Sequence, residues 1–593
     1  MNFKEKLAAI RSLMSEQDIN AYIIPSSDSH ISEYVPEYYK ILAFASGFTG
    51  SAGTLVITRE FAGLWADFRY FVQAEEQLKD SGYELVKLKV QHTPEYIQWL
   101  YQELPENAKV GFDFSLLSMQ IAYQLRTELS YKNISINDCD FISPIWVDRP
   151  ALPAQKATLL EEIACGLSVA EKLKHVRSAM KASKCNLHFI SSLDDIAWLF
   201  NIRGNDVNFN PVVLSYAMIG TESCALFIDK EKLSENSISS LHIQGVQVEP
   251  YEEVYGQINQ LTSDSTVLID DKRNAYKILT SISTSARIIK ETNPSTLLKA
   301  IKNRTEIENM QQAMIKDGVA LTRFFKWLYE TLGKEEITEI TASEKVKYFR
   351  EQNEGFAGVS FASIAGYQAH AALPHYCPTP QTDLALEQRG LFLLDSGGQY
   401  YYGTTDITRT VSLGENTLEE KRDYTLVLAA LISGSDASFP KGTRGYQIDA
   451  ICRKPLWENK INYGHGTGHG VGYFLNVHEG PQNIGPANAP FAVEEGMITS
   501  IEPGIYRPGK HGVRIENLVL TVADGSSEFG EFLKFETITL CYIDTSLILT
   551  DLLDEQQIKW LNDYNEFVYL KLQPYLEPEE AEWLKEKCEK LEA

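Results

Sequence analysis

Four acidic residues of the C-terminal half lie inside apolar, strand-forming stretches, where a hydrophobic pattern does not predict charge. They are Asp395, Asp406, Glu502 and Glu516. A single Asp or Glu is most often a solvated surface group, but four of them in such stretches indicate a shared role. Two buried carboxylates a few ångströms apart repel each other, and a cation between them removes that cost. The four acids therefore predict a metal site.

Two β-hairpins would bring these acids together. The two aspartates lie on the stretches 391–395 and 404–410, and a turn around 399–402 would place them nearly opposite each other. The two glutamates lie on the stretches 497–502 and 512–520, one on each arm of a second hairpin, so that both can face inward. The hairpins thus supply four oxygen ligands from positions far apart in the sequence.

Histidines accompany the acids, since six of the eleven histidines lie in the C-terminal half of the chain. His465 and His469 are four residues apart in a segment with five glycines in nine residues. So much glycine excludes a stable helix, and with it the helical HExxH zinc motif. The segment is instead predicted to present its imidazoles from extended chain. His375 and His478 flank it on either side.

The ligand types indicate the metal and the reaction. Four carboxylates and one imidazole form a hard, oxygen-rich set that suits a pair of Mn²⁺-like ions better than a structural zinc, which prefers Cys and His. Metal pairs ~3.5–4 Å apart serve hydrolysis, because they share and acidify a water molecule. No nucleophile elbow, P-loop or dinucleotide-binding motif in a matching context competes with this interpretation.

The sequence before these motifs predicts α/β architecture. Short apolar strands at 21–25 and 54–58 alternate with helical stretches such as 74–79, and a proline-containing linker at 148–153 ends the first block. A second α/β block follows. A segment with a helix end, a short strand and a Ser/Asp turn recurs at a constant offset of 166 residues, which indicates duplication.

The third block is predicted to open with a long helix. Thr305 to Glu308 has the spacing of a capping box, an apolar face follows it, and Gly333 ends the pattern. The tail from Asp551 onward is also helical, with one apolar side that includes Leu561 and Tyr575. Such a side packs on its own domain more often than at a subunit interface, and both alternatives stay open here.

Composition excludes several classes of protein. The 593 residues are 44% hydrophobic and 23% charged, as in ordinary globular proteins. A formal charge of −25 disfavours nucleic acid and anionic membrane surfaces as partners. No apolar run approaches the ~20 residues of a membrane span, and the N-terminus does not look like a signal peptide. Eight scattered cysteines predict reduced thiols and a cytoplasmic location.

Taken together, the motifs resemble those of a known family. The strings LLDSGGQY, TTDITRT, HGTGHGVG, NVHEGP, EPG and RIEN are similar to those of the Xaa-Pro aminopeptidases, which are pita-bread metallopeptidases. Segments 26–30, 46–53 and 194–201 are similar to the N-terminal modules of the long, three-domain cytosolic form. The resemblance implies two creatinase-like α/β domains, 1–153 and 154–298, before an α+β pita-bread catalytic domain, 299–593, with a C-terminal helical tail.

The resemblance also implies a set of metal ligands. Asp395 would hold one of two divalent ions per subunit, most simply Mn²⁺, and Asp406 and Glu516 would bridge both ions. His469 and Glu502 would complete the second ion. In this family a hydroxide held between the metals attacks the scissile carbonyl, and the residue that matches Glu502 is the proton shuttle.

Further residues match family positions that contact substrate. His375 and His478 match histidines that contact substrate and stabilise the tetrahedral oxyanion, and His465 matches one that lines the pocket. Arg69 matches an arginine that reaches a substrate across a homodimer. One departure stands out: His370-Ala371 replaces the Asn-Gly that the family often has before the position of His375.

The function implied is release of the N-terminal residue from peptides with proline at the second position. Two alternatives remain. One is a prolidase-like dipeptidase, which the doubled N-terminal region disfavours. The other is a catalytically silent pita-bread binding module, which the complete set of five ligands and three accessory histidines disfavours.

Overall fold

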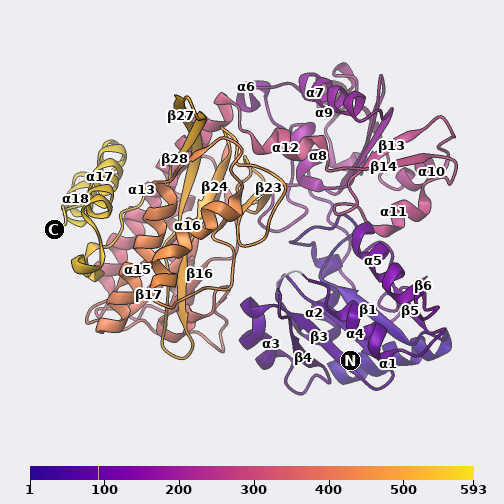
Figure 1. Ribbon diagram of the computed structural model, residues 1–593, viewed down its shortest axis with the longest axis horizontal. Helices are drawn as coiled ribbons and strands as arrows, with labels where there is room; N and C mark the ends of the chain where they lie inside the picture. Colours follow the sequence, from indigo (N-terminus) through magenta and orange to yellow (C-terminus); the bar gives the residue numbers. More distant parts are fainter. Residues whose placement is uncertain (91–92, 593) are drawn as a thin grey trace. The chain divides into compact units, whose positions relative to one another are not determined.

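The computed structural model describes residues 1–90 and 93–592 and divides the chain into two compact units. The first contains residues 1–162 and 167–295, and the second contains 163–166 and 296–593 (Figure 1). The chain passes between them at two short helices, α6 (Glu162–Cys165) and α12 (Pro294–Ala300). In the described part of the chain, no helix is both long and apolar enough to cross a bilayer.

The N-terminal unit contains two six-stranded sheets. The first has the order β4-β3-β2-β1-β5-β6 and the second the order β12-β11-β10-β8-β13-β14. Their strands are β1 (Ala21–Pro25), β2 (Thr54–Thr58), β3 (Ala62–Ala66), β4 (Glu84–Lys87), β5 (Lys109–Phe112), β6 (Ser135–Asp138), β8 (Leu187–Ile190), β10 (Ser215–Gly220), β11 (Cys224–Ile228), β12 (Gln247–Glu249), β13 (Thr266–Ile269) and β14 (Arg287–Lys290). Two further short strands, β7 (Thr158–Leu159) and β9 (Ile202–Arg203), pair with each other.

The two sheets have the same topology, which confirms the duplication that the sequence indicates. In each sheet the first three strands are antiparallel, a fourth adds in parallel at one edge, and two more add in parallel at the other. In the first sheet Ile23 and Val56 pack on one face, while Ile24 and Leu55 pack on the other. Both faces are therefore buried, as in an α/β layer fold.

Helices cover these sheets. They are α1 (Phe3–Glu16), α2 (Ile41–Ser46), α3 (Phe71–Gln77), α4 (Tyr96–Glu103), α5 (Met119–Ser130), α7 (Val169–Ala182), α8 (Leu193–Leu199), α9 (Glu235–Ile243), α10 (Glu253–Asn259) and α11 (Tyr276–Ser281). Capping boxes begin both α1 and α7, at Asn2 and Ser168.

The C-terminal unit begins with the predicted long helix, α13 (Arg304–Thr331). Its capping box is made by Asn303 and Glu306, so the predicted box from Thr305 to Glu308 is wrong by two residues. The asparagine side chain accepts from the backbone N–H of Glu306 at 3.0 Å, and asparagine is at least as good a cap residue as threonine. The apolar face of the helix is buried in the core of the unit, as predicted.

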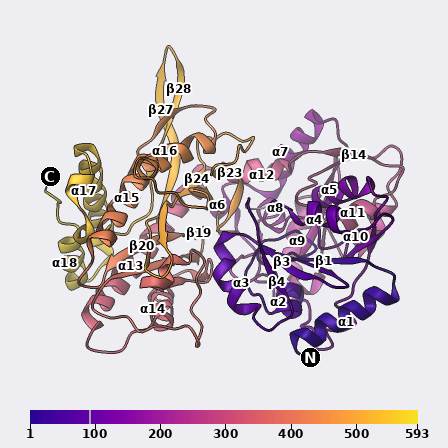
Figure 2. The same ribbon diagram turned by 60° about the horizontal axis from the view of Figure 1, so that its bottom comes forward.

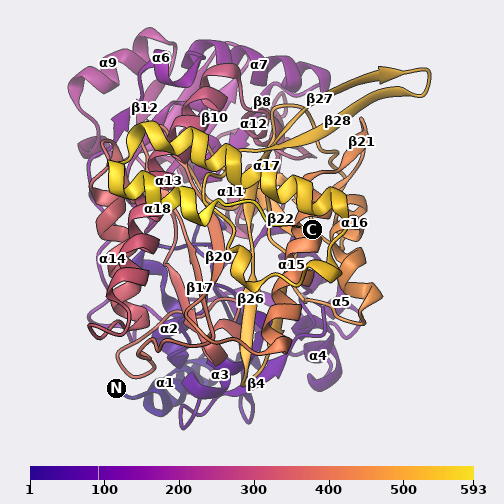
Figure 3. The same cartoon turned by 90° about the vertical axis from the view of Figure 1, so that its left-hand side faces the viewer.

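The remaining strands of this unit form two three-stranded sheets, β16-β17-β20 and β15-β18-β19, a six-stranded sheet, β21-β28-β27-β24-β22-β23, and the pair β25-β26. Their bounds are β15 (Phe356–Val359), β16 (Ile364–Tyr367), β17 (Leu391–Ser396), β18 (Gly398–Tyr400), β19 (Gly403–Thr404), β20 (Ile407–Ser412), β21 (Ser438–Pro440), β22 (Gly468–Gly470), β23 (Glu479–Ile484), β24 (Ile498–Ile501), β25 (Gly504–Arg507), β26 (His511–Arg514), β27 (Asn517–Ser527) and β28 (Gly530–Thr537). The β27–β28 hairpin extends away from the rest of its unit (Figures 2 and 3).

Helices α14 (Glu339–Glu351), α15 (Leu418–Ser435), α16 (Gly445–Glu458), α17 (Glu555–Leu572) and α18 (Pro578–Lys587) complete the unit. The tail helices α17 and α18 contact each other and α13 (Figure 3), so the tail packs on its own unit. Leu561 is fully buried there, but Tyr575 lies beyond α17 and is 54% exposed. The prediction that Tyr575 lies on the packed side is therefore wrong, because α17 ends before this residue.

Candidate metal centre

The first predicted hairpin is present. Strand β17 pairs antiparallel with β20, and Asp395 lies opposite Thr408. Asp406 lies one residue before β20 begins, so the two aspartates are diagonal neighbours, nearly opposite each other as predicted. The connection between the two strands forms a further hairpin, β18–β19, which belongs to another sheet and continues the same register to a turn at Tyr401 and Tyr402.

The second predicted hairpin is also present, with its turn at residues 508–510, but it is split into two strand pairs. Strand β24 pairs with β27, and β25 pairs with β26. Glu502 directly follows β24, and Glu516 directly precedes β27. Both glutamates thus lie at the split, where Pro503 cannot donate to the ladder. At these two positions the side chains do not have to point alternately to the two faces of a sheet, as they do within a strand.

The two hairpins are joined next to these acids. The backbone N–H of Glu516 donates to the carbonyl of Thr408 at 3.0 Å, and the Thr408 hydroxyl donates to Glu516 Oε2 at 2.8 Å. The buried Arg409 guanidinium donates to the Glu516 carbonyl at 2.6 Å and to the Tyr564 hydroxyl of α17 at 2.8 Å. The C-terminal tail is therefore bonded to β20, the strand that directly follows Asp406.

The glycine-rich segment is extended, as predicted. His469 lies in β22, which pairs with β23 on one side and β24 on the other. A Cβ at Gly468 would lie 1.8 Å from the carbonyl oxygen of Ser500, so only glycine permits this close approach of the strands. The Glu502 N–H donates to the Thr467 carbonyl at 2.7 Å. The histidine segment is thus fixed against the second hairpin.

These contacts bring the predicted ligands together. One ligand atom from each of Asp406, His469 and Glu516 lies within 4.8 Å of the others. His469 Nε2 is 3.4 Å from Asp406 Oδ2 and 3.5 Å from Glu502 Oε1. Asp395 Oδ1 and Glu516 Oε1 are buried without a hydrogen-bond partner in the described part of the chain. Orphaned buried carboxylate oxygens are costly, and a hard divalent cation fits this donor set.

The electrostatics of the centre favour protons or cations. Burial, with the neighbouring carboxylates, raises the pKa of Asp395 to about 6 and that of Glu502 to about 7, and raises the pKa of Glu516 well above its usual value. Burial alone would lower the pKa of His469, but the Asp406 and Glu502 carboxylates outweigh it and raise this pKa to about 9. Metal ions compete with protons for these atoms, so metal binding here releases protons.

Removing the metal with a chelator is expected to make stability fall as pH rises. Raised carboxyl and imidazole pKa values mean that the folded protein binds more protons than the unfolded chain. The contribution of these groups to the free energy of unfolding therefore decreases as the pH rises from about 4 to about 9. Bound metal keeps the ligands deprotonated, so the Tm gap between loaded and chelated protein should widen with pH. Calorimetry at pH 5.5, 7.0 and 8.5 measures it.

Comparing the loaded with the chelated protein at each pH cancels the titration of groups remote from the centre. A gap that narrows as pH rises would contradict the assignment of these groups to one metal site.

A hydrogen-bonded chain leads from the centre to an accessory histidine. Arg514 Nη2 donates to Asp395 Oδ2 at 2.6 Å, and its Nη1 donates to the Tyr506 hydroxyl at 2.8 Å. That hydroxyl lies 2.7 Å from His465 Nε2. Arg514 and Tyr506 were not predicted as site residues. The available signal was a charged residue two positions before Glu516 in a stretch that is otherwise apolar.

His478 also lies at the centre. Its ring is 4.4 Å from the ring of His469, centroid to centroid, in an edge-on arrangement. The next residue, Glu479, is buried and accepts from Lys302 Nζ at 2.5 Å, with Lys299 Nζ at 3.7 Å. The two lysines therefore neutralise the carboxylate that follows His478.

The other two predicted substrate residues lie in different units. His375 is half-buried in the connection after β16, and the carbonyl of its neighbour Pro374 accepts from Arg514 Nη2 at 3.4 Å. That bond places the His375 segment beside the centre. Arg69 lies in the N-terminal unit, where its guanidinium forms a two-bond pair with Asp67 at 2.8 and 2.7 Å. A contact between Arg69 and substrate stays a prediction.

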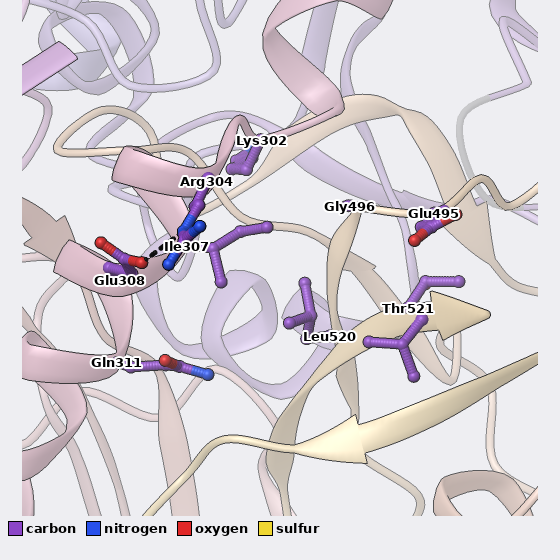
Figure 4. A pocket seen from close by; sticks show the side chains of 10 residues that line it. Lys302, Arg304, Ile307, Glu308, Gln311, Glu495, Gly496, Leu520 and Thr521 are labelled. Carbon is purple, nitrogen blue, oxygen red and sulfur yellow. Dashed lines mark hydrogen bonds and ion pairs between the residues drawn. The ribbon is translucent and has the colours of Figure 1, made fainter. Parts of the chain in front are cut away.

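A separate hollow of about 420 Å³ opens in the C-terminal unit between the start of α13 and strand β27 (Figure 4). Its polar lining includes the Arg304–Glu308 ion pair, with 2.7 Å between Nε and Oε1. None of its lining residues is a predicted site residue, so the hollow is distinct from the metal centre.

Comparison with known proteins identifies the same organisation. The sequence model of metallopeptidase family M24 matches residues 308–523, and that of its C-terminal region matches residues 531–591. Models of the creatinase/prolidase N-terminal domain match residues 6–142 and 148–306. The fold is therefore two creatinase-type N-terminal domains followed by a pita-bread domain, as the sequence predicted.

Individual relatives match over the full length. A probable Xaa-Pro aminopeptidase P of Laccaria bicolor is 39% identical, with 100% of this chain and 94% of the relative covered. Xaa-Pro aminopeptidase 1 of Dictyostelium discoideum is 37% identical, with 99% and 96% covered. The crystal structure of an X-prolyl aminopeptidase from Caenorhabditis elegans, described as a cytosolic enzyme with a di-nuclear active site, superposes with a TM-score of 0.94 at 34% identity and covers 100% of both chains. The chain therefore belongs to the Xaa-Pro aminopeptidase P family of M24 metallopeptidases.

Proposed function

We propose that the chain is a metal-dependent aminopeptidase that releases the N-terminal residue from peptides with proline at the second position. The observation that carries this is the group of four carboxylates and one imidazole, three of them buried and two partly buried, with two orphaned oxygens, in a chain similar to Xaa-Pro aminopeptidases along its whole length. A pair of divalent cations shares and acidifies a water molecule, which supplies the nucleophile for peptide hydrolysis.

The arrangement supports two ions per subunit, and we assign Mn²⁺ to them because hard, oxygen-rich ligand sets suit it. Asp406 and Glu516, which lie among the other ligands, would bridge the ions. Asp395 would complete one ion, and His469 and Glu502 the other. We assign Glu502 as the residue that moves a proton to the leaving amine. The family resemblance supports this role, and so does the position of Glu502 between the two strand pairs of the second hairpin.

The accessory histidines would act on the substrate. An imidazole N–H of His375 and of His478 would donate to the oxygen that gains negative charge when the scissile carbonyl is attacked. His465 would line the substrate pocket, held there by the Tyr506 hydroxyl at 2.7 Å from its Nε2. The ring contact between His478 and His469 supports a place for His478 beside the ligands.

Several wider features belong to the same proposal. The domains would be 1–153, 154–298 and 299–593, and the family models that match residues 6–142, 148–306 and 308–523 support a division into three. A cytoplasmic homodimer, with Arg69 reaching the substrate of the partner subunit, follows from the resemblance. The C. elegans relative is described as cytosolic. No nucleic acid or membrane partner is proposed, given the formal charge of −25.

A substrate series is expected to separate an aminopeptidase from a dipeptidase. An aminopeptidase must recognise a free α-amine and proline, but it leaves the chain beyond proline unconstrained, whereas a dipeptidase must bind the carboxylate directly after proline. We expect kcat/KM for Ala-Pro-Ala to exceed that for Ala-Pro clearly. Ala-Ala-Ala and N-acetyl-Ala-Pro-Ala should both be poor substrates, since one lacks the ring and the other lacks the charged amine.

All four peptides are compared at one Mn²⁺ concentration. A preference for Ala-Pro over Ala-Pro-Ala would favour the dipeptidase. Failure to cleave any of the four by a protein that holds two metal ions would favour the silent binding module.

A further inference from the structure

The first residue of α14, Glu339, is a carboxylate with no exposed surface. In the described part of the chain its recorded side-chain partners all come from one segment, 367–384. Its oxygens accept from the Tyr367 N–H at 2.8 Å, the Tyr376 hydroxyl at 2.7 Å and the Leu384 N–H at 3.2 Å. His370 Nδ1 lies 3.0 Å from both oxygens. A carboxylate can only accept, so this imidazole nitrogen carries the proton.

This segment includes His375 and needs such anchors. It connects β16 to β17 and contains only a short 3-10 turn, Gln368–Ala372, of its own. Long connections with so little regular structure hold one conformation only when side chains fix them. The buried Glu339 carboxylate supplies that restraint, because it forms hydrogen bonds with four groups of the segment. Each of these bonds is stronger than a bond to a neutral acceptor would be, since the carboxylate is charged.

The anchors lie on both sides of His375. Tyr376, the next residue, is bound to Glu339, and the ring of His370 lies 4.4 Å from the Tyr376 ring, centroid to centroid. On the other side, the Pro374 carbonyl accepts from Arg514, which also binds Asp395. His375 is therefore held between a bond to the metal centre and a bond to Glu339.

The backbone of the segment is also closely packed. A Cβ at Gly512 would lie 1.8 Å from the carbonyl oxygen of Ala371, and one at Gly366 would lie 2.8 Å from the Cα of Ala371. The turn before His375 is thus enclosed between β16 and β26. Displacement of the His375 backbone consequently requires release of the polar contacts on its two sides, at Pro374 and at Tyr376.

We propose that Glu339 is a positioning residue that, through His370 and Tyr376, holds the His375 imidazole at the metal centre. The proposal rests on the role of His375 in the proposed function. At position 370, where the family often has asparagine, either side chain can donate an N–H to the Glu339 carboxylate, and in this chain the imidazole of His370 does so.

A double-mutant cycle tests this proposal. E339Q, H375A and E339Q/H375A are compared with the parent protein for kcat on Ala-Pro-Ala, with metal content measured for each. Glutamine keeps the shape of the side chain but loses the charge and one acceptor. E339Q should lower kcat about tenfold with two metals retained, and it should cost nothing further in the H375A background, since residues that act as one unit are not additive.

Matched variants separate positioning from a general effect on α14. T341A removes the capping-box partner in the same helical turn, which contacts Thr338 and not the His375 segment, and it should leave kcat unchanged. H370A should lower kcat, whereas H370N, which keeps a donor, should restore most of it. If E339Q lowers kcat as much in the H375A background as in the parent protein, the two effects are additive and the proposal is overturned. An unchanged kcat in E339Q would overturn it as well.

Hydrogen exchange gives a readout that does not depend on activity. E339Q should speed exchange of the backbone amides in residues 368–376, and T341A should not. Unchanged exchange in E339Q would overturn the positioning role even in a protein with no peptidase activity. A parent protein that cleaves none of the peptides but shows the expected exchange would overturn only the proposed function.

Discussion

D406A is expected to lower kcat/KM for Ala-Pro-Ala by about a thousandfold or more. Asp406 lies with His469 and Glu516 within 4.8 Å, and a bridging carboxylate both places two cations and reduces their mutual repulsion. Loss of a metal's contribution of several kcal/mol corresponds to about tenfold per 1.36 kcal/mol. E516Q should behave similarly, because Glu516 Oε1 is buried and has no hydrogen-bond partner among the described residues.

Steady-state kinetics and metal analysis of the same samples check this prediction. D524A is the matched control: Asp524 is an exposed acid of β27, the same strand that Glu516 precedes, and it contacts Lys534 and Ser438 instead of the centre. We expect D524A to keep parental activity and two ions per chain. Near-normal turnover in D406A would show that the centre does not need a bridging aspartate.

H375A is expected to lose about 10²–10³ in kcat, the typical cost of removing one donor to a developing oxyanion. His375 is not among the converging ligand atoms, and its segment reaches the centre through the Pro374–Arg514 bond. The variant should therefore keep two metal ions. KM should change little, because the lost hydrogen bond is strongest in the transition state.

Metal content decides how a loss of activity in H375A is interpreted. If the ions are lost together with activity, His375 is a ligand and the assignment of its role is wrong. H242A, which removes an exposed histidine of the N-terminal unit, controls for general effects of losing an imidazole and should leave kcat unchanged.

The sequence by itself determined which residue types meet at the centre. Acids within apolar strands are unusual enough to predict a cation, and alternating glycines in residues 464–472 excluded a helix. The paired structure of both hairpins could be predicted as well, since strand periodicity and turn residues are local properties. The duplicated N-terminal fold was visible for the same reason, as a repeated local pattern of helix end, strand and turn.

Long-range partners were decided only by the tertiary structure. The hairpin β18–β19, which lies between β17 and β20 in the sequence, leaves their sheet and pairs with β15 instead. Strand periodicity within the hairpin does not predict that partner, because pairing depends on the free energy of packing against another segment. The cap of α13 is a local feature, made by Asn303 and Glu306, and the sequence was ambiguous there because Thr305 and Glu308 have the same spacing.

The same distinction applies to the groups that hold the site residues. Arg514 lies 119 positions from Asp395, and Glu339 lies 31 positions from His370. Their types and spacing along the chain do not distinguish them from surface charges. They become part of the site because folding buries them, and a buried charge must find partners. The sequence thus predicted the ligands and the class of chemistry, and the tertiary structure decided which charged residues contact those predicted ligands.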